Sequence, residues 1–192
     1  MSDDQKAKER RAKQTVNNLL LSLLATAGLV LLVILVVPRD DSSRIQKVDY
    51  VSIAQQAAAS SARKIVIPDL PKGWWSNQAE WLSKPIDAVP RFESGFVGPK
   101  NEYLGITQAF GVNPTWTALT LKDVVLEKNY SNSGSAIKWS IYKSPVVHDP
   151  VKTMDVIWAG SFGNDEVLLY GTATENQFKT FTQTIEKQLE GK

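Results

Sequence analysis

The chain has 192 residues, no cysteine, one histidine and a formal net charge of +2 at pH 7. A chain without cysteine has no disulfide, no thiolate metal site and no lipid-modified N-terminal cysteine. The excess basic residues lie within residues 1–15, and the rest of the chain carries equal numbers of basic and acidic side chains. A neutral main domain lacks the basic surface of nucleic-acid-binding proteins, so we expect no nucleic-acid partner.

Residues 1–15 form a basic tail, and residues 16–37 ("VNNLLLSLLATAGLVLLVILVV") contain no charged side chain. As a helix this segment would extend roughly 33 Å, which is close to the thickness of the hydrocarbon layer of a membrane. We therefore predict a single transmembrane helix from Val16 to Val37 that contacts the lipid bilayer. Since the lysines and arginines precede the helix, the N-terminus should be cytoplasmic and the C-terminal domain extracytoplasmic.

A cleavable signal peptide is the alternative interpretation of this segment. Ala25, Thr26 and Ala27 fit the pattern of small residues at cleavage sites. The apolar run continues for ten residues beyond Ala27, however, and signal peptides have an apolar region of only about 7 to 15 residues. The length of the run therefore favours a retained signal-anchor in the cell membrane.

After a linker over residues 38–48, residues 49–192 are predicted to form one extracytoplasmic domain. Asp49 can cap a helix over residues 49–62, and Asn113 with Pro114 can begin a short helix that contains Trp116. Alternating apolar runs between turn residues predict strands. The expected strands are 64–67, 74–82, 91–97, 102–110, 136–143, 154–160 and 166–172, with hairpins at "GPKN" and "SFGND".

The C-terminal segment has the clearest helical pattern. Thr174 and Gln177 have the spacing of a capping box, and an apolar stripe follows that stops near Gly191. The stripe consists of Phe178, Phe181, Ile185 and Leu189. A helix, then hairpin-connected strands, then an amphipathic helix predict an α+β domain with a mostly antiparallel sheet and packing helices, preceded by one transmembrane helix.

Several short motifs occur in a fixed order along the chain: "LPKGW" at 70–74, "GFVGPKNEY" at 95–103 and "YGTAT" at 170–174. In this order, and after one membrane span, they resemble a single-pass actinobacterial membrane family classed as a domain of unknown function. The chain departs from that pattern at Arg91-Phe92, where the family has a tryptophan. The resemblance implies no activity, and it implies a fold similar to the Mog1/PsbP-like α+β sandwich, found in exported and accessory proteins that act by binding.

Catalytic chemistry has little support in the sequence. His148 is the single histidine and lies beside Asp149, with Ser144 as the nearest candidate nucleophile, but no G-x-S-x-G motif is present. One histidine without cysteine argues against a zinc or copper site, and the acidic pairs lack the spacing of a calcium loop. We therefore expect a protein that is not an enzyme and has no cofactor or metal.

The tryptophans are the remaining candidates for a functional surface. Trp116, Trp139 and Trp158 lie among alternating apolar residues and are expected in the core. Strand alternation places Trp75 on one face with Asn77 and Trp81, which nominates Trp75 and Trp81 for the core. The family motif instead singles out Trp74, on the other face. Of Trp74 and Trp75, the one that faces solvent is the candidate contact site.

These observations favour one function and leave two alternatives open. The favoured hypothesis is a membrane-anchored, non-enzymatic accessory or interaction subunit that binds a membrane or cell-envelope protein. The first alternative is an envelope sensor that binds a small molecule or glycan in a pocket between sheet and helix. The second is an envelope hydrolase that uses His148.

Overall fold

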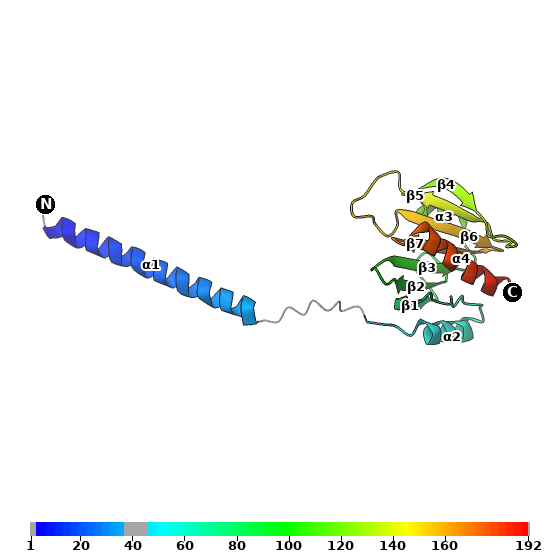
Figure 1. Cartoon of the computed structure of the whole chain (residues 1–192), viewed down its shortest axis with the longest axis horizontal. Helices are drawn as coiled ribbons and strands as arrows, with labels where there is room; N and C mark the ends of the chain where they lie inside the picture. Colours follow the sequence, from blue (N-terminus) through cyan, green and yellow to red (C-terminus); the bar gives the residue numbers. More distant parts are fainter. Residues whose placement is uncertain (1–2, 37–45, 192) are drawn as a thin grey trace. The chain divides into compact units, whose positions relative to one another are not determined.

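The computed structural model describes residues 3–36 and 46–191, and the chain forms two compact units, Met1–Arg44 and Ile45–Lys192 (Figure 1). The first unit contains α1 (Asp3–Val36). The helices of the second unit are α2 (Tyr50–Ser61), α3 (Pro114–Thr120) and α4 (Glu175–Leu189). Its strands are β1 (Trp75–Leu82), β2 (Arg91–Val97), β3 (Tyr103–Ala109), β4 (Val125–Tyr130), β5 (Trp139–Lys143), β6 (Val156–Phe162) and β7 (Asp165–Gly171).

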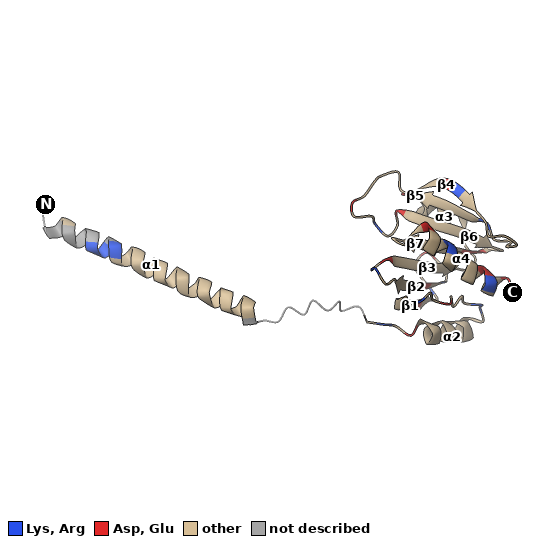
Figure 2. Cartoon of the chain, viewed as in Figure 1, with Lys and Arg blue, Asp and Glu red and all other residues tan. Residues whose placement is uncertain are grey.

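The apolar part of α1 is long enough to cross a membrane. This part runs from Lys13 to Leu35, and its side chains are exposed in the structure. Figure 2 shows basic residues near the start of the described part of α1 and no charged residue in the helix after Lys13. The helix was expected at 16–37, and Val37 and the linker residues 38–45 lie outside the described residues. Both an uncleaved anchor and a signal sequence contain such a helix.

The second unit is built on a seven-stranded antiparallel sheet in the order β1-β2-β3-β7-β6-β5-β4, so the α+β fold class is confirmed (Figure 1). The hairpin β2-β3 pairs Phe96 with Leu104, and the hairpin β6-β7 pairs Trp158 with Leu169, as expected. β4 was not expected, because its residues "VLEKNY" show little alternation and all six side chains are at least partly exposed.

The main core lies between α4 and the sheet. Thr174 and Gln177 form the predicted capping box at the start of α4. Phe178 stacks on Trp158 with ring centroids 5.4 Å apart, and Phe181 packs against Phe96. On the opposite face of the sheet Trp116 of α3 joins a smaller apolar cluster. Trp116, Trp139 and Trp158 are buried, as predicted.

The expected strand at 64–67 is absent from the described structure, because side-chain amides replace strand pairing there. The amide of Gln108 accepts a hydrogen bond from the backbone N–H of Val66 and donates one to the carbonyl of Lys64. Gln188 of α4 accepts from the N–H of Ile67 and donates to its carbonyl. The segment is therefore extended but tied to the domain by two glutamines.

A β-bulge corrects the predicted arrangement of the tryptophans in β1. The pairing with β2 shifts between Ser76 and Gln78, so Asn77 is the extra residue. Trp75 pairs with Val97 and Trp81 pairs with Phe92, which point to opposite faces of β2. Trp75 and Trp81 therefore lie on different faces of the sheet, and the prediction that they share one face is wrong.

Glu186 of α4 is a buried carboxylate that joins the helix to the sheet. It is 5% exposed, and it accepts hydrogen bonds from the indole N–H of Trp139 (2.6 Å) and from the side-chain amide of Asn132 (2.8 Å). Substitution Glu186→Ala leaves the indole N–H without an acceptor in the core, so we expect a loss of about 2–3 kcal/mol in the free energy of unfolding.

The measurement is a denaturant titration of the full chain in detergent. All six tryptophans follow residue 73, so their fluorescence reports on the second unit alone. Gln183→Ala at an exposed position of the same helix is the control and should not change the midpoint. A midpoint for Glu186→Ala equal to that of the control would contradict the assigned role.

Candidate functional site

Trp74 is part of the core. Its side chain is 9% exposed, and its ring meets the ring of Phe181 edge-on at 5.1 Å between centroids. Gly98 allows this packing, because a Cβ at that position would lie 3.0 Å from the Trp74 ring. Gly73 adopts φ +86° immediately before it, and this turn folds Trp74 over the end of the sheet. Trp74 is therefore unavailable as a contact residue.

Trp75 is the more solvent-facing tryptophan of the pair. It is half-buried and pairs with Val97 at the start of the edge strand β1, so the expectation that it belongs to the core is wrong. By the criterion applied to the sequence, Trp75 remains the candidate contact residue. Trp75 lies on one edge strand of the sheet. A cleft in the domain lies at the opposite edge, beside β4.

The cleft has a volume of about 500 Å³ and lies beside the segment that joins β5 to β6. We call residues 144–155 the β5-β6 loop. The cleft is lined by this loop, by the turn before β4 and by the start of β4. Its lining includes Val124, Val125, Ser144, Val146, His148 and Met154.

Asp155 holds the β5-β6 loop in its conformation. One carboxylate oxygen lies 2.8 Å from Nδ1 of His148, and the other accepts the backbone N–H of Lys152 at 2.7 Å. The carbonyl of Asp155 accepts the N–H of Ser144 at 2.8 Å, which closes the base of the loop. With Nδ1–H donating to Asp155, the imidazole of His148 presents its Nε2 away from that carboxylate.

Ser144 and His148 line the same cleft but do not form a nucleophile–base pair. The hydroxyl of Ser144 accepts the N–H of Val146 and donates to the carbonyl of the same residue. No hydrogen bond joins Ser144 to His148 among the residues that the structure describes. His148 is thus paired with Asp155, not with its neighbour Asp149, and the arrangement lacks the serine activation that acyl transfer requires.

Lysine and aspartate side chains stand beside the apolar lining of the cleft. Lys122, Asp123 and Lys152 line it together with exposed apolar residues. Val146 is 58% exposed, and Val125 and Met154 are exposed as well. An apolar surface edged by charged groups is the usual composition of a protein-binding surface.

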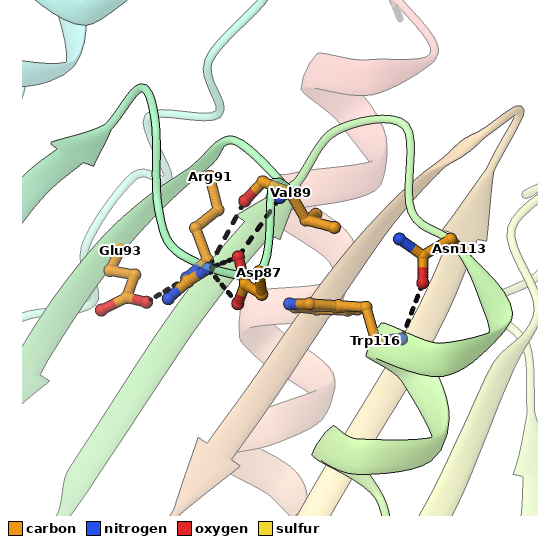
Figure 3. A network of polar contacts seen from close by, with 6 residues as sticks. All are labelled: Asp87, Val89, Arg91, Glu93, Asn113 and Trp116. Carbon is orange, nitrogen blue, oxygen red and sulfur yellow. Dashed lines mark hydrogen bonds and ion pairs between the residues drawn. The ribbon is translucent and has the colours of Figure 1, made fainter.

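A polar network lies at the start of β2, beside Trp116 of α3 (Figure 3). Nη1 of Arg91 donates to both carboxylate oxygens of Asp87 (2.8 and 3.0 Å), and Nε donates to Glu93 (2.7 Å). Burial opposes the positive charge, but the bonds to Glu93 and Asp87 outweigh it and raise the pKa of Arg91. Figure 3 shows Asp87 between Arg91 and Trp116. Arg91 is therefore engaged in fixing the residue 83–90 loop beside α3.

Metal-binding geometry is not present in the described residues, since no three histidine, cysteine, aspartate or glutamate side chains come together to hold an ion.

The cleft itself was not anticipated from the sequence, although one local signal pointed to it. The stretch "SPVVHDPVKTM" places apolar side chains in a loop rich in proline and aspartate, where solvent exposure is expected.

A family model described as "Protein of unknown function (DUF4245)" matches residues 11–185. The match spans the apolar part of α1 and nearly all of the second unit. It confirms a family of unknown function over nearly the whole chain. No curated protein and no solved structure matches the chain.

Proposed function

Because the chain belongs to the DUF4245 family, described only as of unknown function, we propose a function from the geometry of the cleft. The protein is a non-enzymatic accessory or interaction subunit of a cell-envelope or membrane-protein complex. Its anchor is α1, its N-terminus is cytoplasmic, and its α+β domain is extracytoplasmic. The observation that carries this proposal is the set of exposed apolar side chains around the cleft, foremost Val146.

The distribution of charge supports the orientation of the anchor. Basic residues precede the apolar part of α1, and cytoplasmic flanks of membrane helices are enriched in lysine and arginine. The length of the apolar part, Lys13–Leu35, exceeds that of a signal-peptide core and supports retention.

The composition of the cleft supports binding of a protein. Exposed apolar side chains that gather at one concave surface mark interaction sites more often than isolated ones do. In the cleft they come from β4 and from the β5-β6 loop, and Asp155 fixes the loop through hydrogen bonds to Ser144, His148 and Lys152. A surface of this kind needs little rearrangement to bind, which reduces the entropic cost of association.

The experiment is affinity purification of the full chain from detergent-solubilised membranes, followed by quantitative mass spectrometry. We compare the wild type with Val146→Glu, which places a charge at the cleft, and with Phe162→Glu, an exposed apolar residue at the end of β6. Wild type and Phe162→Glu should recover the same membrane or envelope protein, and Val146→Glu should recover at least tenfold less. Recovery of the bait alone, or equal recovery by Val146→Glu, contradicts the proposal.

A small-molecule sensor is the second candidate, and the volume of the cleft favours it. About 500 Å³ lies within the usual range for ligand sites, and Nε2 of His148 supplies a polar group beside the apolar wall. The expected ligand site between α4 and the sheet is instead filled by side chains such as Phe178 and Trp158. Native mass spectrometry of the purified chain should then detect a bound small molecule that is lost in His148→Ala.

The hydrolase alternative makes a different prediction, because it assigns catalysis to His148. Equal activity of wild type and His148→Ala on any cleaved substrate would exclude His148 as a catalytic residue.

A further inference from the structure

The β5-β6 loop exposes apolar side chains outside the cleft as well as inside it. Val147 is 96% exposed and Val151 is 54% exposed, and neither is among the residues that line the cleft. Exposure of this kind costs free energy in water unless another surface covers it. The outer side of the loop is thus a second apolar surface, separate from the cleft that we assign to a protein partner.

The topology places this loop at a defined end of the sheet. The chain enters the domain at Val48, whose N–H donates to the carbonyl of Ser76 at the start of β1. In the antiparallel sheet the start of β1, the end of β5 and the start of β6 lie at one end. The β5-β6 loop therefore lies at the end of the sheet where the chain enters (Figure 1).

The tether between the two units is short. From Val36 at the end of α1 to Val48, the chain reaches at most about 43 Å when fully extended. If α1 is retained in the membrane, this tether limits how far the entry end of the domain can move from the bilayer surface. A short tether raises the effective concentration of the domain at the bilayer, so that a weak second contact between them can form.

We propose that the outer side of the β5-β6 loop contacts the bilayer in which α1 is anchored, through Val147 and Val151; this inference rests on the proposed anchor. The loop backbone carries polar groups that cannot enter hydrocarbon unpaired, so only side chains reach the boundary between headgroups and acyl chains. Lys152 and Asp149 flank these valines with opposite charges. Apolar contact therefore dominates, and the association should be insensitive to salt.

The test uses the full chain in lipid nanodiscs of phosphatidylcholine and phosphatidylglycerol. The natural sequence has no cysteine, so Val147→Cys gives a single site for an environment-sensitive fluorophore. Ser133→Cys, an exposed site between β4 and β5 at the opposite end of the sheet, is the matched control. Spin-labelled lipids should quench the label at position 147 at least twofold more than the label at 133, in 0.05 M and in 0.5 M salt.

A further variant separates the loop from the effects of the label. Adding Val151→Ser to Val147→Cys removes part of the apolar surface and should reduce the quenching towards that of the control. Equal quenching at positions 147 and 133 overturns the inference. Shielding of position 147 only after a membrane extract is added also overturns it, because that outcome indicates that a protein covers the loop. A chain that does not remain with the nanodiscs shows instead that the anchor has failed.

Discussion

Replacing Trp74 with alanine is expected to lower the free energy of unfolding of the domain by about 3–5 kcal/mol. The indole packs edge-on against Phe181 and lies over Gly98, so its removal leaves a cavity at the end of the core. The measurement is a denaturant titration of the full chain in detergent. Tryptophan fluorescence remains usable because five other tryptophans are present.

Trp75→Ala is the matched comparison, because the two residues are adjacent and chemically identical. Trp75 is half-buried at the start of an edge strand, so we expect a loss of about 1–2 kcal/mol. If Trp75→Ala proves as destabilising as Trp74→Ala, the distinction between a core and a solvent-facing tryptophan is wrong.

Substitution Gly171→Ala should be comparably severe, with an expected loss of about 3–5 kcal/mol from backbone strain and steric overlap together. Gly171 has φ +146°, which L residues rarely adopt. A Cβ there would lie 2.1 Å from the carbonyl oxygen of Tyr103, and this oxygen accepts the N–H groups of Thr172 and Ala173. Neither the strand β3 nor the start of α4 can then keep its position.

Gly163→Ala separates the two causes. Gly163 also has a positive φ (+62°), but a Cβ there would meet no atom within 4 Å. We expect about 1 kcal/mol from the backbone conformation alone. A loss for Gly171→Ala no larger than that for Gly163→Ala would show that the close approach to Tyr103 does not exist. Soluble expression levels of the two variants give a rapid first indication of their relative stability.

The elements that were predicted well are those specified by nearby residues. The capping box of Thr174 and Gln177 and the apolar stripe of α4 are determined within one helix. The hairpins β2-β3 and β6-β7 are likewise determined by alternation and a turn of a few residues. Local pattern and tertiary structure agree in these segments, so the sequence alone was sufficient.

The errors arose where a distant residue decides the local structure. Residues 64–67 have the pattern of a strand, but Gln108 and Gln188 satisfy their backbone groups. The bulge at Asn77 changes the face on which Trp75 lies, and alternation cannot detect an extra residue. In the cleft, Asp155 binds His148 across the β5-β6 loop, a pairing that the sequence did not indicate.

The central claim, an anchor with its N-terminus in the cytoplasm and a domain outside, is tested most directly by labelling intact cells. Gln5→Cys and Ser133→Cys are expressed separately in the full chain and treated with a membrane-impermeant maleimide before and after lysis. We predict that position 133 is labelled in intact cells and position 5 only after lysis, with both variants at full length in the membrane fraction. Labelling of position 5 in intact cells, or a product cleaved after Ala27, would contradict the account.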